Sequence, residues 1–155
     1  MGREPVRGSP FEGDISFADW QGLRAVHRNV AGKPFCEQAI AYISYWEMDS
    51  GDFAFATGLL PKNHSEIMNH KVKSMSPEKV VSLGLGLKLG ATMAYDLLRA
   101  AKIAFSYDVE DDYLTYLIET KTGKPIAACN RFLAQHAQTR LGTIRKKAKP
   151  VSATY

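Results

Sequence analysis

The chain has 155 residues, of which 45% are hydrophobic, and its formal net charge is +4 at pH 7. This length provides for one hydrophobic core and is too short for two well-packed domains. No run approaches the roughly 20 consecutive apolar residues of a membrane span, and the first residues lack the apolar segment of a signal peptide. We therefore predict a soluble, cytoplasmic, single-domain protein.

The domain is expected to have a tail at each end. Residues 1–14 are rich in glycine, proline and charge, which predicts a disordered segment, and residues 148–155 are predicted to form a second one. A single folded domain then covers 15–147. Cys36 and Cys129 belong to no C-x-x-C pair, so reduced, packed thiols are expected and neither a cofactor nor a metal is predicted.

The first predicted element is a helix that starts after Ser16. The Ser16 hydroxyl can cap the first turn, and Phe17, Trp20, Leu23 and Val30 form one apolar stripe. Gly32 and Pro34 then stop the helix.

From Gln38 to Leu60 the pattern changes to aromatic and β-branched residues on both sides of a polar turn. Two such runs around Asp49-Ser50-Gly51-Asp52 are typical of a β-hairpin. A helix over 37–48 is the alternative, because the alanines and Glu47 tolerate it and the same turn would end it. Residues 63–73 are predicted to be a short helix or a connector.

The glycine-rich stretch 80–91 admits three interpretations: a strand, a dinucleotide-binding turn with Asp108 as ribose partner, or a buried helix with small residues. The upstream Ser76-Pro77-Glu78 is typical of a helix start. A dinucleotide turn needs a strand before its first glycine, so we favour a helix from Pro77 to about Lys102. Because interior glycines weaken a helix, a kink or break is expected near Gly84–Gly90.

Three further strands and a last helix complete the prediction. Alternating or β-rich runs at 103–107, 113–120 and 125–129 predict strands, and Asn130 is a suitable cap for the final helix. The predicted fold is therefore α+β: an antiparallel sheet of about five strands, two plus three, flanked by a long central helix and by N- and C-terminal helices.

This order of elements resembles that of roadblock/LC7 domains, and profilins and longin domains are similar. The resemblance rests on the Asp49–Gly51 turn, the helix around 91–101, the strand pair from Tyr113 to Cys129 and the Asn130 helix. It implies a five-stranded sheet and a role in dimerisation and scaffolding, often around small GTPases. PAS-like sensors are a second architectural neighbour.

The sequence therefore predicts a non-enzymatic interaction or scaffold module that pairs with itself and with another protein. Three aromatic residues and three glycines are the predicted contact residues: Tyr42, Tyr45, Trp46, Gly84, Gly86 and Gly90.

Two other functions are kept as alternatives. The first is a hotdog-type acyl-thioester hydrolase, for which Asn69, His70 and Asp96 are the candidate polar residues. The second is a small-ligand or nucleotide site at Gly84–Gly90. The histidines at 27, 64, 70 and 136 fit no metal-binding spacing.

The positive charge is concentrated near the C-terminus. Five basic residues could contact phosphate or an anionic surface: Arg140, Arg145, Lys146, Lys147 and Lys149. No acid follows residue 140, so the remainder of the chain is nearly neutral. Because no aromatic residues are interleaved with these charges to stack on bases, the pattern favours a solvated tail over a nucleic-acid contact.

Overall fold

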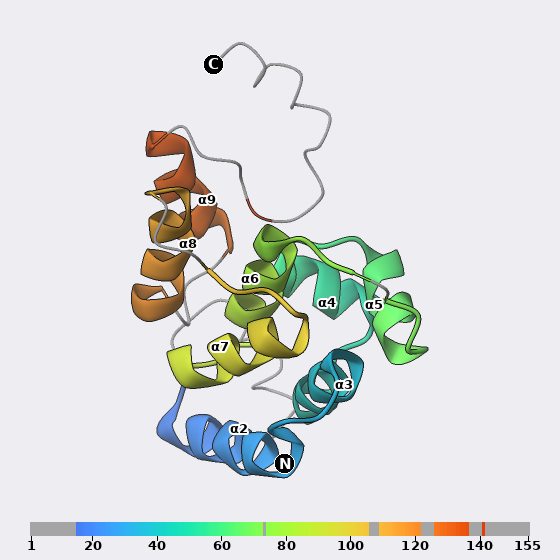
Figure 1. Ribbon diagram of the computed structural model, residues 1–155. Coiled ribbons are helices and arrows are strands. Elements are labelled where there is room, and N and C mark those ends of the chain that lie inside the picture. Colours follow the sequence, from blue (N-terminus) through green and yellow to red (C-terminus); the bar gives the residue numbers. More distant parts are fainter. Residues whose placement is uncertain (1–14, 73, 106–108, 122–125, 137–140, 142–155) are drawn as a thin grey trace.

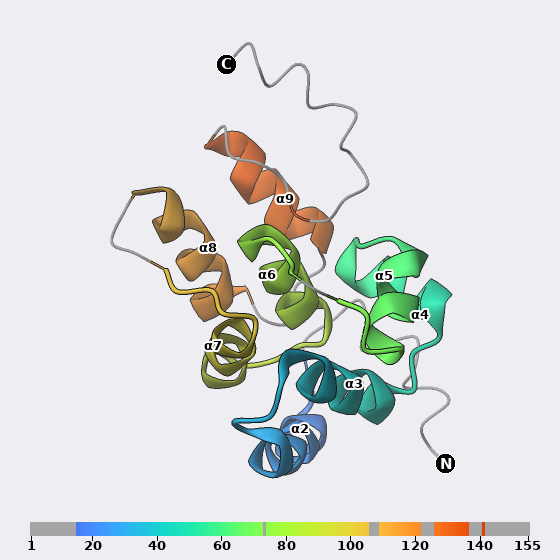
Figure 2. The ribbon, with the colours of Figure 1, turned by 45° about the vertical axis from the view of Figure 1, so that its right-hand side comes forward.

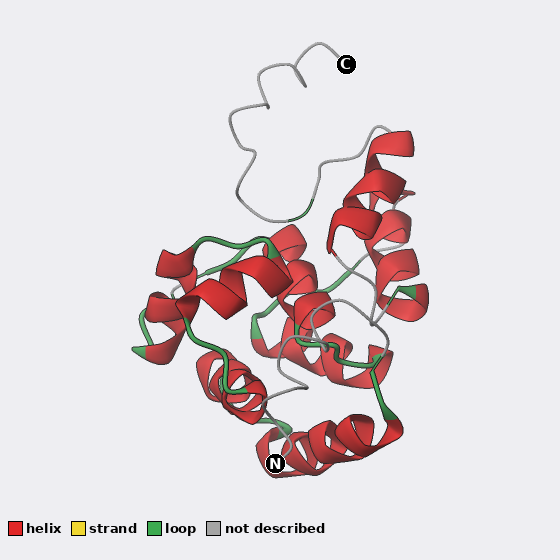
Figure 3. Cartoon of the chain, turned by 180° about the vertical axis from the view of Figure 1, so that it is seen from behind, coloured by secondary structure: helices red, strands yellow, loops and turns green. Residues whose placement is uncertain are grey.

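All the regular structure is helical in the residues that the computed structural model describes, which are 15–72, 74–105, 109–121, 126–136 and 141. They form eight helices and no strand (Figure 1, Figure 3). In chain order the helices are α2 (Phe17–Val30), α3 (Phe35–Trp46), α4 (Ser50–Thr57), α5 (Pro61–Met68), α6 (Pro77–Gly86), α7 (Ala91–Ala100), α8 (Val109–Thr120) and α9 (Ile126–Gln135). None of these eight is long and apolar enough to cross a lipid bilayer.

Helix α6 lies at the centre, with the other helices around it (Figure 1, Figure 2). Every residue from Val80 to Leu89 is buried, and α6 packs against α4, α7, α8 and α9. Helix α2 packs on α3 at the outside of the molecule. Burial on all sides explains why α6 is rich in leucine and glycine and carries almost no charge.

The predicted α+β fold, with its sheet of about five strands, is wrong. The segment predicted as a hairpin forms α3 and α4, residues 113–120 lie within α8, and residues 126–129 begin α9. Residues 103–105 have no regular structure. The remainder of that predicted strand, Pro125 and the two predicted tails lie outside the described residues.

Helical packing overrides β-propensity in α3. Ala39, Tyr42, Ile43 and Trp46 are buried and lie three or four residues apart, so they form one stripe of a helix. The polar segment interpreted as a hairpin turn is a capping box. The Asp49 carboxylate accepts the Asp52 N–H at 2.8 Å, and the Asp52 carboxylate accepts the Asp49 N–H at 3.3 Å. That pair of bonds starts α4.

Two of the three predictions made from helix caps are confirmed, and the third, a final helix capped by Asn130, is wrong, because α9 begins at Ile126 and Asn130 lies inside it. The hydroxyl of Ser16 accepts the Asp19 N–H at 3.1 Å, and Ser76 caps α6 in the same way. The break in the glycine-rich stretch is also confirmed, because α6 ends at Gly86 and α7 begins at Ala91. The left-handed residue in this break is Lys88, with φ 61°, and not a glycine.

A buried polar group lies between α3 and α7. The Tyr42 side chain is fully buried, and its hydroxyl has no hydrogen-bond partner in the described part of the chain. Burial, with a smaller contribution from the negative charge of Asp96, raises the pKa of Tyr42 to about 12. Asp96 itself forms an ion pair with His27 of α2 (Nε2 to Oδ2, 2.5 Å) and bonds Arg99.

We expect Tyr42→Phe to keep or raise the free energy of unfolding at neutral pH and to reduce its loss at alkaline pH. Removing an unpaired buried hydroxyl costs little. Between about pH 10 and pH 12 the unfolded wild-type chain loses the phenolic proton while the folded chain keeps it, so stability falls as pH rises, by at most about 3 kcal/mol. Urea unfolding at pH 8 and pH 11.5 measures this difference. Tyr116 is exposed, so the Tyr116→Phe variant should lose as much free energy of unfolding between the two pH values as the wild type. An equal loss in Tyr42→Phe would contradict the assignment of the raised pKa to Tyr42.

Candidate nucleic-acid interface

A tight three-residue turn joins α4 to α5. Gly58 ends α4 with φ 77°, a left-handed conformation that favours glycine, and its N–H donates to the Ala54 carbonyl at 2.9 Å. Leu59 is fully buried, and its N–H donates to the Thr57 hydroxyl at 3.1 Å. Pro61 is the first residue of α5. The two helices are therefore short, equal in length and closely joined.

The inner face of α5 is fixed against α3 and α4. Ile67 is fully buried and Asn63 nearly so. The Asn63 side-chain oxygen accepts the Leu60 N–H at 3.2 Å at the start of the helix. His64 contacts the Phe53 ring edge-on, with centroids 5.3 Å apart, and bonds the Met48 carbonyl through Nε2 at 3.2 Å. These contacts leave the opposite face of α5 to solvent.

That outer face carries polar side chains on one line. Lys62, Ser65 and Asn69 are exposed and lie three and four residues apart, so they share one side of α5. The Asn69 side chain donates to the Ser65 carbonyl at 2.9 Å. Lysine, serine and asparagine all form hydrogen bonds with the edges of bases in the major groove.

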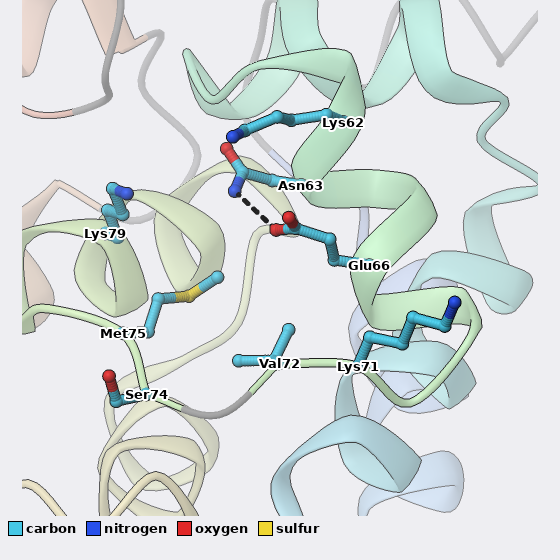
Figure 4. Close-up of a pocket in the computed structure, with 8 residues that line it drawn as sticks. All are labelled: Lys62, Asn63, Glu66, Lys71, Val72, Ser74, Met75 and Lys79. Carbon is cyan, nitrogen blue, oxygen red and sulfur yellow. Dashed lines mark hydrogen bonds between the residues drawn. The ribbon is translucent and has the colours of Figure 1, made fainter.

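A hollow of about 240 Å³ lies between α5, the start of α6 and the connector that joins Met68 to Pro77. Three lysines from these three segments line it: Lys62, Lys71 and Lys79 (Figure 4). Glu66 also lines the hollow, where its carboxylate accepts a bond from the Asn63 amide at 3.3 Å. Three lysines and one glutamate are the charged residues of this lining in the described part of the chain, so the surface is positively charged.

The start of α4 has the opposite charge. Asp49 and Asp52 face each other there, and the hydrogen bond from the Asp52 backbone lowers the pKa of Asp49. Ionised carboxylates repel phosphate, so the positive end of α4 is not available to a phosphate group. The favourable surface for a polyanion is restricted to α5, the connector and the start of α6.

The structure places four of the six residues predicted for partner contacts inside the chain's own core. Tyr42, Trp46, Gly84 and Gly86 are buried, and Tyr45 and Gly90 are half-buried. The Trp46 indole N–H donates to the Leu87 carbonyl at 2.8 Å. The five predicted basic residues, Arg140, Arg145, Lys146, Lys147 and Lys149, lie outside the described residues.

The other candidate chemistries gain no support from the geometry. His70 and Asp96 line two different hollows, and the sheet that a hotdog fold requires does not occur in the described residues. Within the same residues no group of three metal-ligating side chains comes together. Sequence reasoning missed the paired helices, although Gly58 and Pro61 are a helix stop and a helix start three residues apart.

No protein-family model, curated protein or solved structure matches this chain. The resemblance to roadblock/LC7 domains is therefore not tested by these comparisons. The sheet that it implied is contradicted by the helices described above.

Proposed function

We propose that this chain binds double-stranded DNA through a helix-turn-helix formed by α4 and α5. The observation that carries the proposal is the pair of eight-residue helices joined by Gly58, Leu59 and Leu60, with the second helix buried on one face only. In DNA-binding helix-turn-helix units the second helix enters the major groove and reads base edges.

The proposed contacts with DNA are of two kinds, to bases and to phosphates. The exposed side chains Lys62, Ser65 and Asn69 face the bases, where lysine pairs with guanine and asparagine with adenine. Lys71 and Lys79 flank α5 and contact backbone phosphates, which supply affinity without sequence information. Repulsion keeps the acidic start of α4 away from the DNA backbone. This repulsion restricts the orientation in which α5 enters the major groove.

Dimerisation fits this function. Helix-turn-helix proteins often bind two half-sites about one helical turn apart as symmetric dimers. The homodimer predicted from the sequence, its interaction with another protein and its cytoplasmic location remain predictions, and a DNA-binding role is consistent with all three.

Fluorescence anisotropy with a labelled random-sequence duplex tests the proposal. At physiological salt we expect a dissociation constant on the order of 10⁻⁴ to 10⁻⁶ M, as for non-specific binding. Its logarithm should change with the logarithm of the salt concentration by about 0.9 for each phosphate contacted, or about 2 for Lys71 and Lys79 together. Selection from a random pool should then enrich one sequence. Binding that does not depend on salt, or an unselective pool, would overturn the proposal.

A further inference from the structure

A second, larger hollow lies on the other side of the connector between α5 and α6. Its volume is about 580 Å³, and three segments enclose it: the start of α3, the connector and the end of α7. Small-molecule sites have volumes of roughly 300–1,000 Å³. The hollow is therefore large enough for a small organic ligand.

The lining of this second hollow is apolar and includes two basic residues. Phe35, Val72, Met75 and Ile103 are the larger apolar residues of its wall. His70 and Lys102 are its basic residues, and among the described residues no aspartate or glutamate lines it. Such a lining complements a molecule with an apolar body and a negative charge.

The backbone holds both basic residues in fixed positions. His70 follows α5 with φ 55°, and Lys102 follows α7 with φ 64°. Their N–H groups donate to the Ile67 and Arg99 carbonyls at 3.0 and 2.9 Å. Because the backbone is held at both positions, only their side chains must become ordered when a ligand binds.

The start of α3 adds hydrogen-bond donors. Phe35 and Cys36 are the first two residues of this helix and line the hollow. The first N–H groups of a helix have no acceptor within it, and Pro34 offers no side-chain acceptor. These N–H groups can donate to a carboxylate.

The connector is a wall shared by the two hollows. Val72, Ser74 and Met75 line both the larger hollow and the lysine-lined hollow of the DNA-binding surface. A molecule that fills the larger hollow must therefore contact residues that position Lys71 and the start of α6. Binding on one side of this wall can then change the geometry on the other.

We propose that the larger hollow binds a small carboxylate with an apolar tail, and that the bound molecule alters the affinity for DNA. The ligand site stands on the lining alone, whereas its effect on DNA rests on the proposed function. The carboxylate lies near Lys102, His70 and the start of α3, and the tail lies against Val72, Met75 and Ile103.

Isothermal titration calorimetry of the full chain with hexanoate, decanoate and tetradecanoate tests the site, with decanol as the uncharged probe. We expect saturable binding of at least one carboxylate and at least tenfold weaker binding of decanol. Lys102→Gln should weaken carboxylate binding about tenfold, and Ala101→Phe, which fills the hollow, should abolish it. Lys121→Gln, a lysine at the end of α8, is the matched control.

Circular dichroism of each variant checks that the fold is retained, and if Ala101→Phe does not fold, Ile103→Trp serves as the blocking variant. Absence of carboxylate binding, or equal binding to the blocked variant, would overturn the site. Anisotropy with labelled duplex and saturating decanoate then tests the coupling, for which we expect a change of threefold or more in the dissociation constant. An unchanged constant would overturn the coupling, whereas carboxylate binding by a chain that binds no duplex would overturn the proposed function and leave the site standing.

Discussion

Gly86→Ala should destabilise the protein by about 1–3 kcal/mol or more, because α4 and α6 touch at this residue. A Cβ atom on Gly86 would lie 2.6 Å from the Thr57 methyl carbon and 2.7 Å from the Ala56 carbonyl oxygen. Both atoms belong to a tightly joined part of α4, and the carbonyl is backbone that cannot turn aside. Urea unfolding followed by circular dichroism measures the change in the free energy of unfolding.

Gly84→Ala is the matched control in the same helix. A Cβ atom there would meet only the Ala94 methyl group at 3.5 Å, which is an ordinary contact. Since alanine favours a helix over glycine by about 1 kcal/mol, we expect Gly84→Ala to be neutral or stabilising. Equal effects of the two substitutions would show that the α4–α6 contact is looser than the structure indicates. This contact also sets the position of α5 through the turn at Gly58.

Replacing Lys62, Lys71 and Lys79 together by alanine should remove most DNA binding at physiological salt. Lys71 and Lys79 contact phosphates, and each contributes about one to the slope of the logarithm of affinity against the logarithm of salt concentration, so the slope should fall by about two. The loss of Lys62 removes a base contact in addition. Asn69→Ala should instead leave the slope unchanged and relax the preference for one base, at a cost of about 1–3 kcal/mol in discrimination. Anisotropy titrations at several salt concentrations measure both effects.

A charge-matched variant separates this surface from general electrostatics. Arg28 lies on α2, Lys121 follows α8, and Arg131 lies on α9. Figure 1 shows α8 and α9 on the other side of α6 from α5. Replacing these three residues by alanine changes the net charge equally. We expect it to change affinity by less than threefold, and an effect as large as that of the first variant would count against α5 as the binding element.

The basic C-terminal run is tested by the same titrations. Replacing Arg145, Lys146 and Lys147 by glutamine removes three positive charges from the basic run that the sequence analysis singled out. If this run alone held DNA, that variant would lose binding while the α5 variant kept it. We expect the run to contribute to non-specific affinity only, so that the sequence enriched by selection stays the same.

Local sequence signals predicted where helices begin and end better than they predicted whether a segment is a helix or a strand. The starts at Ser16 and Ser76 and the break after Gly86 follow from caps and glycines, which act within a few residues. The hairpin prediction failed because Tyr42, Ile43 and Trp46 have high β-propensity, and only burial on one helical stripe against neighbouring helices overrides that preference. The capping box at Asp49 was visible in the sequence but was interpreted as a turn.

The candidate interface was accessible only through the fold. Lys62, Lys71 and Lys79 are spread over 18 residues, and nothing in their spacing brings them to one hollow. Their convergence depends on the path of the connector, which is held by Val72 and Met75 packing on the core. The exposed line of Lys62, Ser65 and Asn69 likewise appears only once α5 is known to be a helix with Ile67 inside.

The sequence by itself determined that one core is present, where several helices begin and that the glycine-rich stretch is interrupted, because composition, caps and glycines act locally. Tertiary structure decided the rest. It decided that aromatic segments form the helices α3 and α8, that Gly86 packs closely against α4, and that three lysines come together beside α5. These outcomes depend on which apolar faces meet, and that is a property of contacts between residues far apart in the chain.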